Sequence, residues 1–122
     1  MTEETSPNDE FAHRLCVKWE EAARQVETLG VRLAILRIGL VLDAGGGTLQ
    51  KMLPPFKLGL GGRFGDGKHF MPWIHRDDLV EAMLFLLEDQ TLTGPFNASA
   101  PNPVTNAEFT RILAKTLKRP AI

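Results

Sequence analysis

The sequence predicts an α/β fold that makes up only the far half of a doubly wound domain. Two observations lead to this prediction. Stretches with helical periodicity alternate with short apolar runs typical of strands. Only one of those runs, Val31 to Leu42, is long, so most of the helices have little sheet to cover. A complete doubly wound domain would contain more strands.

Composition limits the possible classes of function. The 122 residues are 43% hydrophobic and 24% charged, which is ordinary for one globular domain or part of a larger one. The net charge is −1 and no basic block precedes the last turn, which argues against nucleic-acid binding. No apolar run approaches the roughly 18 residues of a membrane span. The single cysteine, Cys16, excludes an internal disulfide, so we predict a cytoplasmic location and a packing role for this residue.

The chain begins with an acidic, polar stretch. Residues 1–8 are predicted to be a flexible lead-in, and residues 9–122 to form the domain. Asp9 is the expected cap of a first helix, and Gly30 is its expected stop. Glu20 and Glu21 fall off the apolar stripe and are predicted to be solvated. The stripe recurs at steps of three and four and consists of Phe11, Leu15, Trp19, Ala22, Ala23, Val26 and Leu29.

The long apolar run and the glycines after it come next. Val31 to Leu42 lacks alternation, which favours a strand covered on both faces. A buried helix is the competing interpretation. Three glycines then lead into a short helix with Thr48 as its expected cap. Pro54 and Pro55 are predicted to end or kink that helix.

The second half of the chain alternates in the same way. Gly59 to Gly67 holds five glycines and is predicted to be a loop. His69 to Ile74 is a short strand candidate, which Pro72 restricts to an edge or an irregular strand. Asp77 or Asp78 is the expected cap of a third helix.

The last elements carry clearer local signals. Phe96 to Ala98 is a small strand candidate. Thr105 and Glu108 have the T-x-x-E spacing of a capping box, which predicts the start of the last helix. Pro120 stops it.

Motifs for phosphate or metal binding are largely missing from the sequence. Neither G-x-G-x-x-G nor the P-loop pattern occurs. The run from Gly45 to Thr48 could present N–H groups to an anion, but a plain turn is the favoured interpretation. No spacing of His, Cys, Asp or Glu indicates a metal site.

Two charged or titratable positions leave alternatives open. Arg37 interrupts an apolar run, so it either pairs with a carboxylate or faces a site at the strand end. His75 either holds its loop by a hydrogen bond, which is the favoured interpretation, or contacts substrate. Asp77 and Asp78 are read as helix caps and not as an acid/base pair.

Four segments, taken in order, resemble one enzyme family. They are FAHRLCVKWEEAA, LRIGLVLDAGGGTLQKMLPPFKLGLGG, GDGKHFMPWIHRDDLV and GPFNASAPNPVTNAEF. Together they are similar to the epimerase-like branch of the extended short-chain dehydrogenase/reductases, the NAD-dependent epimerase/dehydratase group. The resemblance implies a Rossmann-like fold that binds NAD(P), with a glycine fingerprint near its N-terminus and a Tyr-x-x-x-Lys pair in mid-chain.

The chain departs from that pattern in two respects that matter for activity. The glycine fingerprint is missing, and the sequence contains no tyrosine. The expected fold is therefore the C-terminal, substrate-side portion of the family's domain, without the N-terminal dinucleotide-binding half. A fragment of this kind is predicted to be inactive alone, and no catalytic or metal-binding residue is assigned to it.

The resemblance also assigns binding roles to individual residues. Arg37, Ile38, Gly39 and Leu40 match the strand end whose backbone approaches the nicotinamide. Many family members carry asparagine where Leu40 stands, and many nucleotide-sugar epimerases carry a diphosphate-binding arginine where Met71 stands. Four further residues match positions that surround the substrate, namely Met52, Phe56, Trp73 and His75.

The leading hypothesis is thus a fragment of an NAD(P)-dependent, epimerase-like oxidoreductase of the nucleotide-sugar epimerase family. In the intact enzyme its partner would be a small-molecule substrate, with nucleotide sugars as the family's class. The alternative is a non-catalytic binding or oligomerising module, because unpaired sheet edges and half-covered helices favour self-association.

Overall fold

The computed structural model describes residues 10–121. The predicted lead-in over residues 1–8 and the expected cap at Asp9 lie outside that range. The chain divides into two compact units. The first takes its described residues from Met1–Arg37 and Ala82–Asn97, and the second from Ile38–Glu81 and Ala98–Ile122. None of the helices within residues 10–121 is long and apolar enough to cross a membrane.

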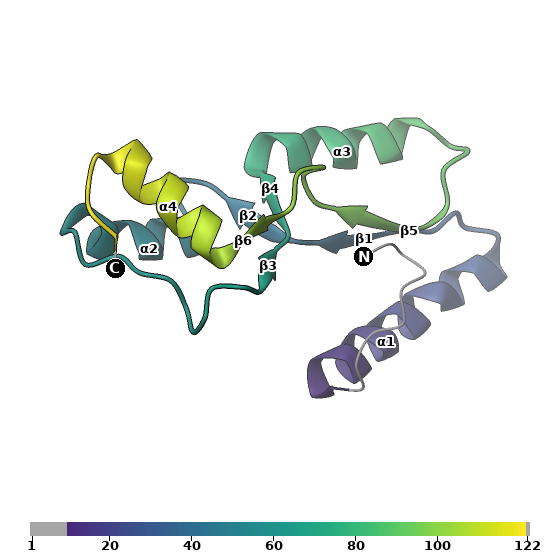
Figure 1. The fold of residues 1–122 in the computed structure, drawn as a ribbon. Helices are drawn as coiled ribbons and strands as arrows, with labels where there is room; N and C mark the ends of the chain where they lie inside the picture. Colours follow the sequence, from purple (N-terminus) through teal and green to yellow (C-terminus); the bar gives the residue numbers. More distant parts are fainter. Residues whose placement is uncertain (1–9, 122) are drawn as a thin grey trace. The chain divides into compact units, whose positions relative to one another are not determined.

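The first unit contains the helix α1 (Phe11–Arg24), a 3-10 turn η1 (Gln25–Leu29) and most of the strands β1 (Ala34–Ile38) and β5 (Gly94–Ala98). The two strands pair with each other (Figure 1). Gly30 ends the helical stretch in a left-handed conformation, as predicted.

The predicted apolar stripe of α1 is present but uncovered. No residue of this helix is buried, and Phe11 and Trp19 are 74% and 65% exposed. Cys16 is exposed as well, so the prediction that it packs inside the protein is wrong.

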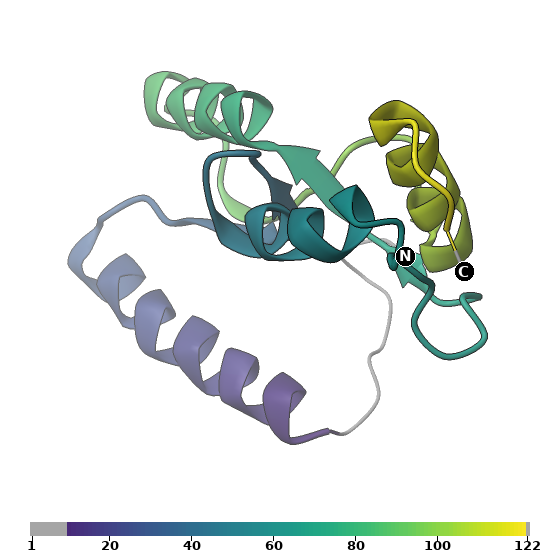
Figure 2. The same ribbon diagram turned by 90° about the vertical axis from the view of Figure 1, so that its left-hand side faces the viewer.

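The second unit is built on two small sheets. The strands β2 (Leu40–Leu42) and β4 (Trp73–His75) pair in parallel, and β3 (Phe70–Met71) pairs antiparallel with β6 (Val104–Thr105). The helices α2 (Gly47–Lys57) and α4 (Asn106–Leu117) belong to the same unit. In Figures 1 and 2 the loop after α2 runs below α4. The buried apolar residues of this unit are Phe56, Ile74, Leu79, Ala98, Phe109 and Ala114.

The long predicted strand is divided at Gly39. The N–H of Gly39 donates to the Ala98 carbonyl at 3.1 Å, and the N–H of Leu40 donates to the Pro72 carbonyl at 2.6 Å. The chain therefore changes partner strand at this residue, from β5 to β4. None of its residues is fully buried, contrary to the prediction of a strand covered on both faces, because the described residues contain only a few short strands.

Two predicted helix boundaries are also wrong. The helix α2 has Gly46 as its N-cap residue instead of Thr48. Of the two effects predicted for Pro54 and Pro55, an end or a kink, the end does not occur, since the helix continues to Lys57. The helix α3 (Arg76–Glu88) begins one residue before the expected aspartate caps, so Asp77 and Asp78 lie in its first turn. There their negative charge complements the helix dipole.

The capping box at the start of α4 is confirmed. The Thr105 hydroxyl accepts from the Glu108 N–H at 3.2 Å, and the Glu108 carboxylate accepts from the Thr105 N–H at 3.0 Å. The second of these bonds, with that from the Thr105 hydroxyl, holds the pKa of Glu108 below its ordinary value.

Pro72 separates β3 from β4, which accounts for the irregular strand predicted there.

Candidate functional site

The carboxyl ends of two parallel strands meet in the second unit. The register pairs Leu40 with Trp73 and Leu42 with His75, so β2 and β4 end side by side. Asp43 follows the first strand directly, and Arg76 follows the second. Ligands of open α/β sheets bind outside the carboxyl ends of strands, at a point where the strand order changes. This edge is therefore the candidate functional site.

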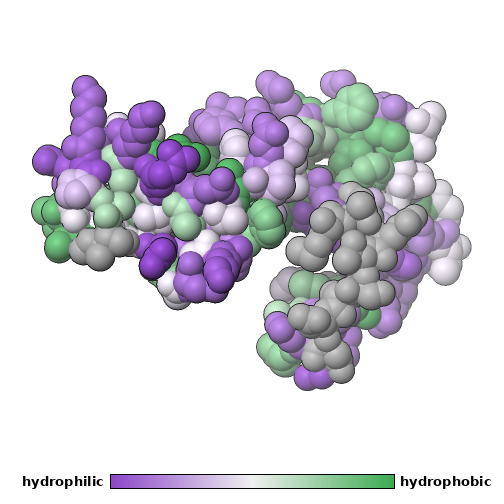
Figure 3. Space-filling model, viewed as in Figure 1, coloured by the Kyte–Doolittle hydropathy of each residue, from purple (hydrophilic) through white to green (hydrophobic). Residues whose placement is uncertain are grey.

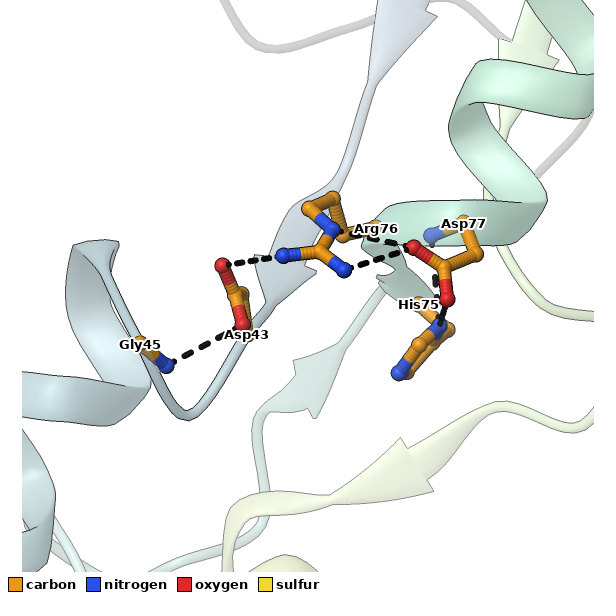
Figure 4. Close-up of polar contacts among 5 residues, drawn as sticks. All are labelled: Asp43, Gly45, His75, Arg76 and Asp77. Atoms are coloured by element: carbon orange, nitrogen blue, oxygen red, sulfur yellow. Dashed lines mark hydrogen bonds and ion pairs between the residues drawn. The ribbon is translucent and has the colours of Figure 1, made fainter.

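An ion-pair network links the two strand ends (Figure 4). Asp43 accepts from Arg76 Nη1 at 3.1 Å and from the Gly45 N–H at 3.1 Å. The Gly45 bond, followed by the charge of Arg76, holds the pKa of Asp43 below its ordinary value. Arg76 also donates to Asp77 at 2.9 Å, and Asp77 and Asp43 raise the pKa of Arg76. Two carboxylates thus surround one guanidinium, which leaves no unpaired positive charge for an anion.

His75 forms the N-terminal cap of α3. Its Nδ1 accepts from the Asp77 backbone N–H at 3.2 Å. This bond is the structural role that the sequence favoured, and it fills the place expected for an aspartate cap. With Nδ1 as an acceptor, the neutral ring carries its proton on Nε2, which is then a donor. The side chain is 53% exposed, so that donor is accessible to a ligand.

Backbone atoms pack closely against the strand residues next to His75, namely Gly39, Leu40 and Trp73. A Cβ on Gly39 would lie 2.4 Å from the Pro72 carbonyl oxygen. Trp73 is half-buried, and its indole Nε1–H donates to the Asn102 carbonyl at 3.2 Å. The main chain of Gly39, Leu40 and Trp73 is therefore fixed in place, while the side chain of Trp73 is already hydrogen-bonded.

Met52 and Phe56, the two residues of α2 that are expected to surround the substrate, differ in exposure. Met52 is half-buried. Phe56 is only 3% exposed, and a Cβ on Gly61 would lie 2.4 Å from its ring. The structure thus places Phe56 in the core of the second unit, with Gly61 against the ring face.

Arg37 belongs to the first unit and has a carboxylate partner. Its Nε and Nη2 donate to the two oxygens of Glu20 at 2.8 and 2.9 Å, a bidentate pair. Of the two alternatives for Arg37, the structure shows the ion pair. The prediction that Glu20 is solvated is wrong, since its side chain is 19% exposed. The bond from Arg37 holds the pKa of Glu20 below its ordinary value of 4.5.

This pair predicts a pH dependence of stability. A lowered carboxylate pKa stabilises the fold above the ordinary pKa, and this contribution is lost as the pH falls through the folded value. Replacing Glu20 with glutamine should therefore flatten the loss of stability between about pH 6 and pH 3. Urea titrations followed by circular dichroism measure the effect. Glu21→Gln is the matched control because Glu21 is exposed on the same helix. Equal acid sensitivity of the wild type and Glu20→Gln would contradict the prediction.

Two site residues, Asp43 and Arg76, were missed by the sequence analysis. The available signal was their position directly after a strand, next to Leu42 and His75, but it has meaning only once β2 and β4 are known to pair. Within residues 10–121 no cluster of His, Cys, Asp and Glu could hold a metal ion.

Comparisons with known proteins give the same α/β fold. No protein-family model matches the chain. An epimerase family protein of Mycobacterium bovis is 42% identical over 120 residues, which are 98% of this chain and 40% of the relative. The chain thus spans about 40% of the length of the curated relatives it matches.

Two solved structures are similar at comparable identity. The crystal structure of a human epimerase family protein with NADPH has a TM-score of 0.88 and 41% identity over 98% of this chain and 41% of its own. A nucleoside-diphosphate sugar epimerase from Corynebacterium glutamicum has a TM-score of 0.81 and 39% identity over 99% of this chain and 27% of its own.

Proposed function

Since the chain is homologous to part of the epimerase family proteins of the extended short-chain dehydrogenase/reductases, we propose that it is the substrate-side portion of an NAD(P)-dependent, epimerase-like oxidoreductase. The match to a structure with NADPH, at 41% identity and a TM-score of 0.88, is the observation that carries this proposal. The similarity also agrees with the fold class predicted from the sequence, a portion of a Rossmann-like domain.

The proposed cofactor contact is the segment Arg37, Ile38, Gly39 and Leu40. The N–H groups of Gly39 and Leu40 already donate to other carbonyls, and the Arg37 guanidinium is paired with Glu20. Gly39 and Leu40 can therefore offer a cofactor only carbonyl oxygens and van der Waals surface. The charged phosphates of NAD(P), which need N–H donors or cations, would have to be held by another part of the protein. A bound cofactor would accept and return the hydride.

The proposed substrate contacts lie at the strand ends. His75 offers its Nε2–H donor, and Trp73 and Met52 offer apolar surface. Phe56, in the core of the second unit, would support the residues that contact the substrate. The substrate class proposed is a nucleotide sugar, because the similar protein from C. glutamicum is a nucleoside-diphosphate sugar epimerase.

A chimera tests the proposal. Residues of this chain would replace the matching segment of the human relative, and NADPH binding would be followed by cofactor fluorescence. We expect the chimera to bind NADPH. The isolated chain should show no NAD(P)-dependent turnover, because it contains no tyrosine and no glycine fingerprint.

The unmodified human relative is the positive control in that experiment. A chimera that folds, as judged by circular dichroism, but does not bind NADPH would contradict the proposal. So would turnover of a nucleotide sugar by the isolated chain.

A second candidate function is self-association through uncovered apolar surface. On α3, five apolar side chains are 43% to 65% exposed, and Figure 3 shows hydrophobic residues over its C-terminal half. We propose that this helix face binds a second copy, because exposed apolar patches of this kind mark interaction sites. Light scattering of the pure chain at micromolar concentration should show a dimer or larger species. A monomer throughout that range would exclude this candidate. The residues of this face are Val80, Met83, Leu84 and Leu87, and the exposed Phe85 lies to one side of it.

A further inference from the structure

A pocket with four cationic side chains lies in the second unit. It has a volume of about 430 Å³ and is lined by Arg63, Arg111, Lys115 and Arg119, together with Thr110 and three alanines. We call it the basic pocket. Figure 3 shows hydrophilic residues over the part of the surface where α4 lies. None of the residues proposed above to contact cofactor or substrate lines it, so the basic pocket is separate from the strand-end site.

Helical periodicity brings two of the cations together, and the turn after α4 adds a third. Arg111 and Lys115 are four residues apart on α4 and so lie on one face. Arg119 comes four residues later, just past the helix end, where its N–H donates to the Ala114 carbonyl at 3.0 Å. Like charges at this spacing repel each other, so the arrangement has a cost unless an anion is present.

The fourth cation comes from the glycine-rich loop. The loop is fastened to the start of α4, because the Phe64 N–H donates to Asn106 Oδ1 at 2.6 Å and the Ala107 N–H donates to the Gly67 carbonyl at 3.0 Å. A Cβ on Gly67 would lie 3.1 Å from Arg63 Cδ and 3.0 Å from the Ala107 Cβ. Glycine at this position therefore lets the Arg63 stem lie close against α4.

The positive charge of the basic pocket is not neutralised by the part of the chain that the structure describes. None of its four cations forms an ion pair there, although the chain as a whole has a net charge of −1. The charge of Arg111 contributes to the lowering of the pKa of Glu108, after the bonds from Thr105. Its carboxylate is occupied by the Thr105 N–H and hydroxyl in the capping box.

Thr110 borders the basic pocket, but its hydroxyl does not open into it. This residue lines the basic pocket and is 4% exposed, yet its hydroxyl has no hydrogen-bond partner among residues 10–121. A threonine inside a helix commonly donates to the carbonyl four residues earlier, which here is that of Asn106. A buried hydroxyl without a partner is costly. Its oxygen is closed to solvent, so a ligand in the pocket cannot reach it, and any ligand contacts are left to the four cations.

We propose that the basic pocket binds a phosphorylated small molecule. The phosphoryl oxygens would be held by the four cations, Arg63, Arg111, Lys115 and Arg119. Guanidinium groups suit phosphate because their N–H donors match its oxygens in pairs. The volume suits a small ligand, since ligand pockets usually measure about 300 to 1,000 Å³.

Inorganic pyrophosphate is the probe that tests this proposal. Isothermal titration at low salt should show saturable binding with one site per chain. In two-dimensional NMR the amide signals of Thr110, Arg111 and Lys115 should shift on addition of pyrophosphate. The double variant Arg111→Gln/Lys115→Gln should weaken binding at least tenfold, because it removes two charge-assisted contacts.

Two further variants make the test specific. Thr110→Val changes a residue that borders the basic pocket and should leave binding unchanged, because its hydroxyl is closed off from the pocket. Lys51→Gln removes one positive charge from α2, outside the basic pocket, and should leave binding unchanged. The proposal is overturned if Lys51→Gln weakens binding as much as the double variant does. It is also overturned if sulfate or an acidic peptide binds as tightly as pyrophosphate. None of these outcomes depends on NADPH, so they are separable from the chimera experiment.

Discussion

Gly39→Ala should lower the free energy of unfolding by about 2 to 3 kcal/mol, the upper part of the range for overpacking. The added methyl group would lie 2.4 Å from the Pro72 carbonyl oxygen and 3.0 Å from the Pro72 carbonyl carbon. Both are backbone atoms, so no side chain can turn aside to make room. Pro72 is itself held by the bond from the Leu40 N–H. The strand pair β2–β4 would have to separate, and the strand-end site with it.

Urea denaturation of the purified variant measures this effect. Gly46→Ala is the matched control, since a Cβ there would lie 3.8 Å from its nearest neighbour, in ordinary van der Waals contact. Its backbone is extended, with φ of −164°, which alanine readily adopts. A Gly39→Ala protein as stable as this control would show that β2 and β4 do not approach as described.

Asn106→Ala is the second change with a large expected effect, about 2 to 3 kcal/mol of lost stability. Asn106 is fully buried, at 0% exposure, and connects three segments. Its Oδ1 accepts from the Phe64 N–H, its Nδ2 donates to Met71 Sδ at 3.2 Å, and its own N–H donates to the His69 carbonyl at 3.0 Å. Alanine would leave the Phe64 N–H without an acceptor and open a cavity.

The measurement is again urea denaturation, with Asn102→Ala as the control. Asn102 is exposed, and only its backbone carbonyl accepts a bond, from Trp73. The same chemical change there should cost less than about 0.5 kcal/mol. The prediction fails if the two variants are equally stable. Loss of the Asn106 side chain should also loosen Arg63, so pyrophosphate affinity should fall alongside stability.

Local signals predicted the elements that depend on few neighbours. The T-x-x-E spacing of Thr105 and Glu108 identified the start of α4, because a capping box involves only residues within one turn. Gly30 identified the end of the first helical stretch for a similar reason. By contrast, the division of the long strand at Gly39 depends on Ala98 and Pro72, which are distant in sequence. No local pattern contains that information.

The prolines of α2 show a second limit of prediction from local sequence patterns. Proline removes an N–H donor, so Pro54 and Pro55 leave the carbonyls of Gln50 and Lys51 without their usual helical partners. Both of those residues are exposed, and water can bond to their carbonyls. The carbonyls of the prolines themselves accept from the N–H groups of Leu58 and Leu60. The helix therefore continues past both prolines to Lys57.

The binding roles assigned through resemblance stay predictions, but the structure shows where their residues lie. The structure brings Leu40, Trp73 and His75 together on neighbouring strands. The structure places Arg37 in the first unit, paired with Glu20, and Phe56 in the core of the second unit. Asp43 and Arg76 could not be found in advance, because their proximity follows from the register of β2 against β4.

The division of both units into two separated stretches of chain affects the order of folding. The β1–β5 pair closes a loop that contains most of the second unit. Loop closure costs more entropy as the loop lengthens, and contacts distant in sequence form late. We therefore expect the second unit to gain its structure first and to shorten the effective distance between β1 and β5. Pulse-labelled hydrogen exchange during refolding should protect amides of α4 before those of β5, and the reverse order would rule out this sequence of events.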